Sequence, residues 1–465
     1  MACMKTTFLL ALIFLLLQTE FISLEAIWSN SSAGNSTVGC IEMEREALLK
    51  FKEGLDDPSR TLSSWVGEDC CNWLGVGCSN RTGNIIKLDL NGQLLCDQIS
   101  DYTCSWPLGG VLSPSLLELK FLNYLDLSYN DFEEIPIPNF IGSLHKLTYL
   151  NLSHTYFDGT IPPQIGNLSN LLYLDLSSAF FDGTIPPQIG NLSNLLYLDL
   201  SGAWIDGPIP PQIGNLSNLL YLDLSGLFLP ASNIKWLSGL SSLKYLNLNY
   251  MYLSQATTDW LQTVNLLPSL LELHLSDSDL HYLPQSVPFV NFTSLSVLDL
   301  SYNDFNSSSI PQWMFNLTSL TNLQLSYCNL TGSIPKIAKG NLCKLRTMDL
   351  SVNNLSGEIT EFFQALSECS NSSLEELYLS QNKLIGNIPH SLGNLKRLRE
   401  LQLYSNAVSV FGISLKDNMT PLLIKCKLSS PKECRGFSHD RGTLRDRLGP
   451  NLDDYTFIIS RNCCY

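Results

Sequence analysis

The phrase L-x-x-L-x-L-S recurs along the 465-residue chain, and this repetition constrains the fold more than any other feature. Most copies start 24 or 25 residues after the preceding one. Their first apolar residues are Ile85, Leu122, Leu147, Leu171, Leu195, Leu219, Leu243, Leu270, Leu295, Leu320, Leu345, Leu374 and Leu398. Self-similarity at such a period is typical of solenoids, in which each unit packs only against its neighbours. We therefore predict a repeat array of about 13 units over residues 85–406.

Each unit is predicted to begin with a short strand. Alternate leucines such as Leu174 and Leu176 lie on one side of a strand and point into the interior. An asparagine two residues after the serine is expected to bond loop backbone groups that would otherwise be unpaired. Such asparagines are Asn130, Asn303, Asn353, Asn382 and Asn406. The middle units have Thr155, Ala179, Ala203 or Met251 instead, so we expect a weaker ladder there.

The second half of many units contains G-x-I-P, as at 159–162, 183–186 and 207–210. Glycine permits a tight turn, and proline suits an edge segment because it donates no hydrogen bond. The whole pattern resembles the plant-specific leucine-rich repeat. This resemblance implies an α/β repeat fold, a right-handed leucine-rich-repeat horseshoe with a parallel sheet on its concave face. Two successive units lack G-x-I-P, so the second strand should be interrupted around 251–290.

Residues 40–84 lie outside the repeat and are expected to form a helical N-terminal cap. The first coil of a solenoid needs such a cap because no neighbour covers its apolar end. Leu48, Phe51 and Leu55 share one face of a predicted helix. Trp65 and Trp73 are expected to pack beneath it.

Six cysteines fall in this cap or shortly after it. A bond between the adjacent Cys70 and Cys71 would be strained, so each is expected to pair elsewhere. We predict the disulfides Cys40–Cys70, Cys71–Cys78 and Cys96–Cys104, with a structural role in an oxidising compartment.

Two later cysteines, Cys343 and Cys369, occupy nearly equal phases in successive units. Adjacent strands lie about 4.8 Å apart, which is within the Cα separation that a disulfide tolerates. We predict a bond between them that anchors the lengthened unit starting at Leu345; two buried free thiols are the alternative. Cys328 has no partner of equal phase and is expected to stay reduced.

Three segments carry a more specific resemblance: CIEMEREALLKFKEGL, DCCNWLGVGC and LCKLRTMDLSVNNLSGEI. They are similar to plant leucine-rich-repeat receptor-like proteins, in the group of the fungal-xylanase receptors. The resemblance implies a cell-surface glycoprotein of the plasma membrane that senses an extracellular protein or peptide. It also implies that the protein lacks a kinase and signals in plant defence through a partner co-receptor kinase.

The N-terminus predicts a secretory signal peptide over about residues 1–26. Lys5 precedes ten apolar residues from Phe8 to Leu17, which is too short for a membrane span. Export would give the N-x-S/T sequons access to the glycosylation machinery, and hence N-linked glycans. The expected sites are Asn80, Asn167, Asn191, Asn215, Asn291, Asn316, Asn329, Asn354 and Asn371. Asn167, Asn191 and Asn215 share one phase, so we expect them to lie on the outer side and to be modified together.

Residues 407–465 do not continue the repeat phase, and no membrane helix follows. The interpretation that we favour is a truncated receptor-like protein whose tail is a gene-model artefact. A novel cap that uses Cys426, Cys434, Cys463 and Cys464 is the alternative. Spacing alone does not establish its connectivity.

Composition and motifs exclude several function classes. The net charge of −15 opposes binding to nucleic-acid phosphates or to anionic lipid. The sequence contains no hydrolase, zinc-protease, P-loop or kinase motif, so we expect no enzyme activity, metal or cofactor. Aspartates recur at one position of the strand phrase, and we expect them to form a solvated column: Asp126, Asp175, Asp199, Asp223, Asp299 and Asp349.

The concave face is the predicted ligand-binding surface, because residues that alternate with the inward leucines point to it. Tyrosine recurs once per unit from Tyr124 to Tyr245. Exposed tyrosines favour binding, whereas tyrosines that only stack on one another would cover the strands. The duplicated units vary too little to encode a shape, so later units are the better candidates. The predicted binding residues are Tyr245, Tyr250, His274, Tyr302, Tyr327 and Tyr378.

The leading hypothesis is therefore extracellular recognition in plant defence signalling. A soluble secreted inhibitor of a microbial cell-wall-degrading enzyme is the second hypothesis, favoured if the tail is genuine. A receptor kinase whose kinase half is missing ranks third, because the sequence of the cap is more similar to receptor-like proteins.

Overall fold

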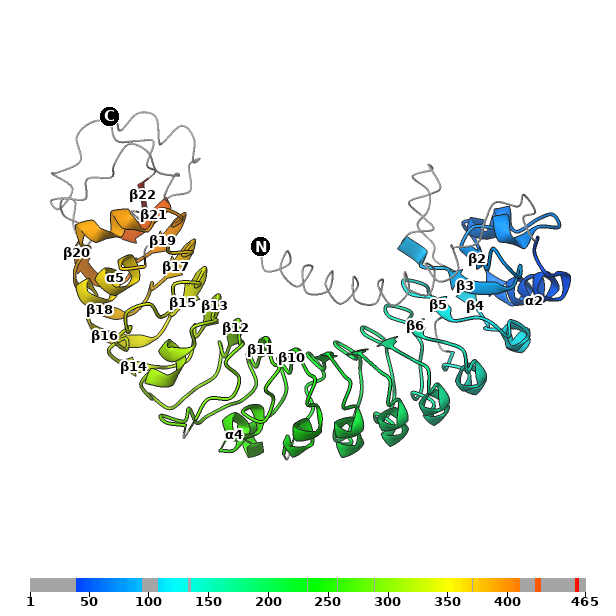
Figure 1. Ribbon diagram of the computed structural model, residues 1–465, viewed down its shortest axis with the longest axis horizontal. Coiled ribbons are helices and arrows are strands. Elements are labelled where there is room, and N and C mark those ends of the chain that lie inside the picture. The colour runs from blue at the N-terminus through cyan, green and yellow to red at the C-terminus, as the bar shows by residue number, and fades with distance from the viewer. Residues whose placement is uncertain are drawn as a thin grey trace.

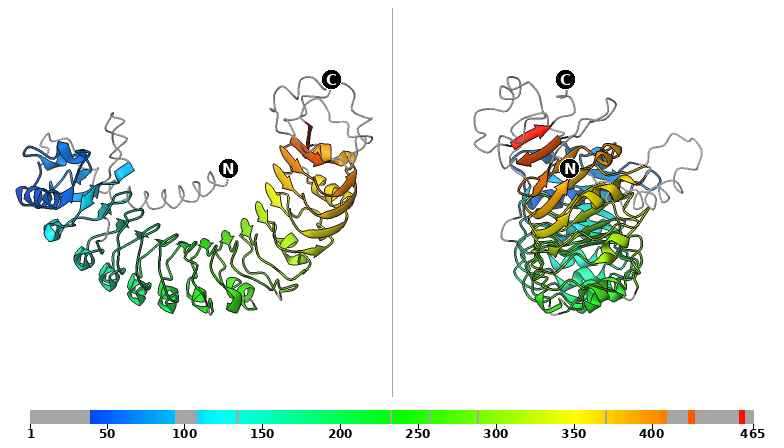
Figure 2. Two further views of the ribbon diagram at one scale, coloured as in Figure 1. Left: turned by 180° about the vertical axis from the view of Figure 1, so that it is seen from behind. Right: turned by 90° about the vertical axis from the view of Figure 1, so that its left-hand side faces the viewer.

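The chain forms a curved solenoid in the computed structural model (Figure 1). The structure describes residues 39–93, 108–132, 135–231, 233–256, 258–287, 289–369 and 371–409, together with the backbone of strands at 423–427 and 456–459. Strands line the inner side of the arc and short helices line the outer side, as both face views show (Figure 2). The predicted horseshoe with a parallel concave sheet is confirmed.

One sixteen-stranded sheet runs the length of the described chain. Its strands are β2 (Val76–Cys78), β3 (Ile85–Asp89), β5 (Tyr124–Asp126), β6 (Tyr149–Asn151), β7 (Tyr173–Asp175), β8 (Tyr197–Asp199), β9 (Tyr221–Asp223), β10 (Tyr245–Asn247), β11 (Glu272–His274), β12 (Val297–Asp299), β13 (Asn322–Gln324), β15 (Thr347–Asp349), β17 (Glu376–Tyr378), β19 (Glu400–Gln402), β21 (Leu423–Lys427) and β22 (Thr456–Ile459). Equivalent residues of neighbouring coils are in register, so Leu198 pairs with Leu222 and Leu222 with Leu246. Each of the thirteen predicted units supplies one strand, from β3 to β19.

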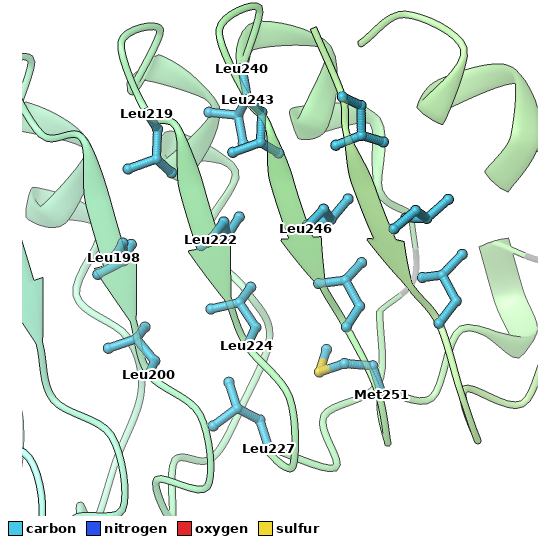
Figure 3. Packing of buried hydrophobic residues seen from close by; sticks show 14 of the residues in the cluster. Leu198, Leu200, Leu219, Leu222, Leu224, Leu227, Leu240, Leu243, Leu246 and Met251 are labelled. Carbon is cyan, nitrogen blue, oxygen red and sulfur yellow. The ribbon is translucent and has the colours of Figure 1, made fainter. Parts of the chain in front are cut away.

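Leucines fill the interior of the coils. Leu198, Leu222 and Leu246 lie behind successive strands and are fully buried, as are Leu200 and Leu224 (Figure 3). Burial of one such side chain stabilises the fold by about 1.5–3 kcal/mol. A strict repeat therefore produces a continuous core in which each coil covers its neighbour.

The predicted asparagine ladder is present. Asn303 Nδ2 donates to the carbonyl oxygens of Leu275 and Leu300, at 2.7 and 2.9 Å, and Oδ1 accepts from the amides of Ser278 and Leu280. Buried backbone groups of two coils are thereby satisfied. In the middle units, buried Ala179, Ala203 and Met251 replace these bonds with apolar packing.

The outer side of the arc carries short helices. They are η3 (Pro114–Glu118), η4 (Asn139–Ser143), η5 (Pro163–Asn167), η6 (Pro187–Asn191), η7 (Pro211–Asn215), η8 (Lys235–Gly239), η9 (Ser254–Ala256), α4 (Trp260–Val264), η10 (Gln312–Asn316), α5 (Thr360–Ser367) and η11 (His390–Asn394). Their packing requires glycine: a Cβ at Gly190 would lie 2.3 Å from the carbonyl oxygen of Gln212 on the next coil. None of the described helices combines the length and apolar character needed to cross a bilayer.

A second parallel sheet of four strands lies beside the C-terminal coils. It contains β14 (Thr331–Gly332), β16 (Asn354–Glu358), β18 (Lys383–Asn387) and β20 (Ala407–Ser409). Towards the N-terminus, the described residues of this flank form isolated bridges instead of strands, at Pro136–Asp158, Pro230–Tyr252 and Ser309–Thr331. Among the described residues none joins the segment between Tyr252 and Ser309, as the missing G-x-I-P motif predicts.

The N-terminal cap contains helix α2 (Glu42–Glu53) and the short helices η1 (Thr61–Ser64) and η2 (Cys70–Asn72). Leu48 and Phe51 are buried beneath α2, and Trp65 stacks on Trp73 with ring centroids 5.5 Å apart. Leu55 was expected on the helix but lies in strand β1 (Leu55–Asp56), because α2 ends before Gly54 and β1 pairs with β4 (Gly109–Gly110).

The predicted disulfides Cys40–Cys70 and Cys71–Cys78 are confirmed. The structure also joins Cys343 to Cys369, with Cα atoms 5.5 Å apart, so that the bond links the coil before helix α5 to the chain just after it. Cys328 is buried and free, as expected.

Several expectations lie outside the described residues: the signal peptide over 1–26, the disulfide Cys96–Cys104, and the side chains of the tail. Backbone of the tail nevertheless extends the concave sheet. Strand β21 pairs in parallel with β19, and β22 pairs antiparallel with β21. Sheet pairing therefore continues beyond residue 406, where the leucine phrase has ended.

Candidate functional site

The N-terminal half of the concave face is closed by stacked tyrosines. Six rings from β5 to β10 form one continuous pile, with neighbouring centroids 4.1 to 4.3 Å apart. Its members are Tyr124, Tyr149, Tyr173, Tyr197, Tyr221 and Tyr245. Tyr245, one of the predicted binding residues, is only 3% exposed and is packed into this pile. Because the strands are in register, they place identical rings at stacking distance, and each ring face is covered by the next ring instead of by solvent.

The aspartates beside this pile are also buried, which corrects the expected solvated column. Asp175, Asp199 and Asp223 lie at equivalent positions of β7, β8 and β9. The Tyr197 hydroxyl donates to Asp199 Oδ2 at 3.1 Å, and the Ser201 amide donates to Oδ1 at 2.8 Å. Burial, followed by the charges of the two neighbouring aspartates, raises the pKa of Asp199 well above its ordinary value. The hydrogen bonds of these carboxyl groups lie within the sheet, and the groups offer little surface to a ligand.

The C-terminal half of the concave face is different because its units vary. At the position of the tyrosine pile it presents Glu272, Val297, Asn322, Thr347, Glu376 and Glu400 in succession. No continuous ring pile forms from these residues, so polar side chains remain accessible along β11 to β19.

Three predicted binding residues lie just beyond the strands. Tyr250, Tyr302 and Tyr327 are each about half exposed and have positive φ angles of 63°, 58° and 57°. Such left-handed backbone is uncommon outside glycine, and here it marks the tight turn that follows each strand. Tyr302 stacks on Tyr327 with ring centroids 4.7 Å apart, whereas Tyr250 contacts the ring of Phe228 on the preceding coil.

A hollow of about 380 Å³ opens beside Tyr327. Its lining residues are Tyr327, Asp349, Ser351, Val352, Tyr378, Ser380, Gln381, Gln402 and Tyr404. The Tyr378 hydroxyl donates to Glu400 Oε2 at 3.3 Å, which holds that ring. Burial raises the pKa of Asp349, although bonds from the Ser351 hydroxyl and amide oppose this rise. The lining contains aromatic rings and a carboxyl group but no basic side chain.

His274 lies between the two halves of the face. Its ring is 5.3 Å from that of Tyr245 and ends the pile. Its Nε2 lies 3.5 Å from Glu272 Oε2, and both side chains are largely buried. His274 is thus part of the strand packing rather than of the hollow.

The predicted residues therefore separate into three groups. Tyr327 and Tyr378 line the hollow and Tyr302 stacks at its rim, whereas Tyr250 belongs to another coil, and Tyr245 and His274 are packed into the sheet. The sequence reasoning missed Gln402 and Tyr404, which lie in the last regular unit. Gln402 and Tyr404 occupy the same positions of the repeat as Tyr378 and Ser380 in the preceding unit. Inclusion of one more unit in the predicted binding surface would therefore have found them.

A metal is not supported at the one sulfur cluster found in the described residues. The sulfur atoms of Cys40, Cys70 and Cys71 lie within 4.8 Å of one another. All three belong to disulfides, whereas zinc binds cysteine as the thiolate.

Comparison with known proteins matches this architecture. Family models for a leucine rich repeat N-terminal domain and for a leucine-rich repeat region match residues 41–79 and 105–228. A further leucine rich repeat model matches 294–317, 319–340, 344–366 and 373–395.

Two receptor-like proteins of Solanum lycopersicum, EIX2 and EIX1, are 49% and 46% identical to this chain over 156 and 158 residues. Each match covers 33% of this chain and 14% of the relative, so the chain matches only a small part of their length.

Solved structures show the same fold. The PEPR1–AtPEP1 structure has a TM-score of 0.61 and 31% identity, and the match covers 79% of this chain and 49% of that one. The Arabidopsis receptor kinase HAESA ectodomain, in complex with an N-terminally extended IDA peptide hormone ligand, has a TM-score of 0.51 and 27% identity, and the match covers 79% of this chain and 70% of that one. The cap and the repeats identify the chain as a leucine-rich-repeat protein, and it is similar to plant receptor-like proteins.

Proposed function

We propose that this chain recognises an extracellular protein or peptide ligand on the C-terminal half of its concave face. The observation that carries the proposal is the hollow beside Tyr327, Asp349 and Tyr378. It lies where the units vary and where the strands are not covered by the tyrosine pile. Concave sites with a few convergent polar groups are the usual places for ligands.

The chemistry of the hollow favours a positively charged group on the ligand. Asp349 and the nearby Glu400 supply negative charge, and the rings of Tyr327 and Tyr378 can receive a guanidinium or ammonium group. Hydrogen bonds to a charged partner are stronger than those between neutral groups. A lysine, an arginine or a free amino terminus of the ligand would therefore bind there.

The cellular role proposed is that of a kinase-less receptor-like protein at the plant cell surface, acting in defence through a partner co-receptor kinase. The similarity to the tomato receptor-like proteins supports this role, although the match covers little of their length. The peptide in the HAESA structure supports ligand binding by an ectodomain of this shape.

A direct test uses the full-length chain secreted from plant cells and immobilised. A fungal xylanase is the first probe, because the sequence resembles that receptor group. Binding is measured for wild type and for Asp349→Asn with Tyr378→Ala. We expect the double variant to weaken binding at least tenfold, the loss typical of well-buried contact residues.

Phe289→Ala is the matched control, since Phe289 is 68% exposed but lies outside the hollow. Equal loss in the control and in the double variant would contradict the assignment of the site. The hydrolytic activity of the bound xylanase is measured in parallel. If binding abolishes that activity and no receptor kinase associates with the chain in cells, the enzyme-inhibitor role replaces the receptor role.

A further inference from the structure

A strip of exposed aromatic rings crosses five consecutive coils on the flank between the concave sheet and the outer helices. Its members are Tyr156, Phe180, Trp204, Phe228 and Tyr252, which share one position of the repeat. Their side chains are 40% to 71% exposed, and Trp204 is the most exposed. At ~200 Å² per aromatic side chain, five half-exposed rings present roughly 500 Å² of surface. A contiguous apolar patch of this size typically marks an interaction site.

The strip is held in place by its backbone. The Trp204 amide donates to the Ala179 carbonyl oxygen at 3.0 Å, and the Tyr252 amide donates to Leu229. Three of the rings also contact one another, with centroids 5.4 Å apart for Tyr156 and Phe180 and 5.3 Å apart for Phe180 and Trp204. A partner would therefore meet a preorganised surface and lose little entropy in ordering it.

A row of carboxylates runs parallel to the rings. Asp158, Asp182 and Asp206 follow the aromatic residue by two positions in three coils and are exposed on the same flank, because the segment is extended. Among the described residues none of the three takes part in an ion pair. The sequence contains no lysine or arginine between Lys146 and Lys235, so these coils supply no cation of their own.

We propose that this strip docks an extended segment of a partner protein in which basic side chains alternate with apolar ones. Such a segment would place its apolar side chains over the rings and its lysines or arginines beside the three aspartates. Cation–π contact with the exposed ring faces adds to this complementarity. A second copy of the chain is a poorer occupant, because strip-to-strip contact would oppose like charges, and the chain as a whole carries a net charge of −15.

The test uses the full chain and a fluorescein-labelled decapeptide of alternating lysine and leucine. Alternating glutamate–leucine and lysine–serine decapeptides are the comparison probes. Binding is followed by anisotropy, and burial of Trp204 by its protection from acrylamide quenching. The quenching signal is assigned by its loss in Trp204→Phe. We expect only the lysine–leucine peptide to bind and to protect Trp204, with affinity that falls as salt is raised.

Phe180→Ser with Trp204→Ser should weaken binding about tenfold or more, and Asp182→Asn with Asp206→Asn several-fold. Phe121→Ser and the pair Asp56→Asn with Asp259→Asn are exposed controls outside the strip, and they should change affinity less than twofold. All these residues are exposed, so unchanged circular dichroism and melting temperature establish folding. Equal binding by the glutamate–leucine peptide, or unaltered affinity of the strip variants, would overturn the proposal. So would a dimer in sedimentation experiments that the Phe180→Ser, Trp204→Ser variant abolishes.

Discussion

Replacement of Asp199 by asparagine should stabilise the protein at neutral pH. Asp199 lies between Asp175 and Asp223 on adjacent strands, and all three are buried. Two charges about 4.8 Å apart repel by roughly 3 kcal/mol at an effective dielectric constant of about 20. Partial protonation of the row lowers this figure, so we expect a gain of about 2 kcal/mol in the free energy of unfolding at pH 7.

The shape of the site tolerates the replacement. Asn247 occupies the same position of the repeat, where its Nδ2 donates to Asp223 Oδ2 at 2.9 Å and its Oδ1 accepts from the amide of Asn249. An asparagine at position 199 can accept from the Ser201 amide in the same manner, so the gain is not offset by a lost backbone bond.

The pH dependence follows from the direction of the pKa shift. Burial, with the neighbouring aspartates, raises the pKa of Asp199 in the folded state. Its contribution to stability is therefore complete below the unfolded pKa, near 3.8, and is lost as the pH rises through the higher folded pKa. The advantage of Asp199→Asn should consequently be largest at pH 7 and shrink to less than about 0.5 kcal/mol near pH 3.5.

Urea unfolding of the full chain, followed by far-ultraviolet circular dichroism at pH 7 and at pH 3.5, measures both quantities. Asp299→Asn is the matched control, because Asp299 stands between His274 and Gln324 instead of between two carboxylates. No stabilisation by Asp199→Asn at pH 7, or an equal gain in the control, would refute the argument from like-charge repulsion.

Three further changes test the coil packing. Gly190→Ala should lower the free energy of unfolding in urea by about 1–3 kcal/mol, because the new Cβ meets a backbone oxygen of the next coil. Gly393→Ala is the control and should have little effect, because no atom lies within 4 Å of the new Cβ. Asn303→Ala should cost about 4 kcal/mol, because two buried amides and two buried carbonyl oxygens each lose a hydrogen bond. Native-state hydrogen exchange should show the loss at Ser278 and Leu280. Burial raises the pKa of the Cys328 thiol to about 12, so iodoacetamide at pH 8 should label this cysteine only after unfolding. Peptide mapping that finds labelled Cys328 in the folded protein would contradict this expectation.

The repeat spacing of the sequence was sufficient to predict the architecture. An interval of 24 or 25 residues with alternating leucines permits one way of burying all the leucines, which is to stack the coils in register, as Leu198, Leu222 and Leu246 show. The asparagine ladder and the bond between Cys343 and Cys369 followed from position in the unit, because a solenoid converts equal phase into spatial contact.

Exposure could not be derived from phase alone. Alternation places Tyr245, Asp199 and Tyr378 on the same face of the sheet. Tyr245 and Asp199 are nevertheless buried by their neighbours in the adjacent coils. Tyr378 has no aromatic neighbour at its own position and lines the hollow. Whether a side chain on the concave face meets water or another ring depends on the residues of the adjacent coils and on the separation between strands. The three-dimensional stacking of the coils therefore determined which part of the predicted surface is available to a ligand, and it revealed the aromatic flank that the leucine pattern does not indicate.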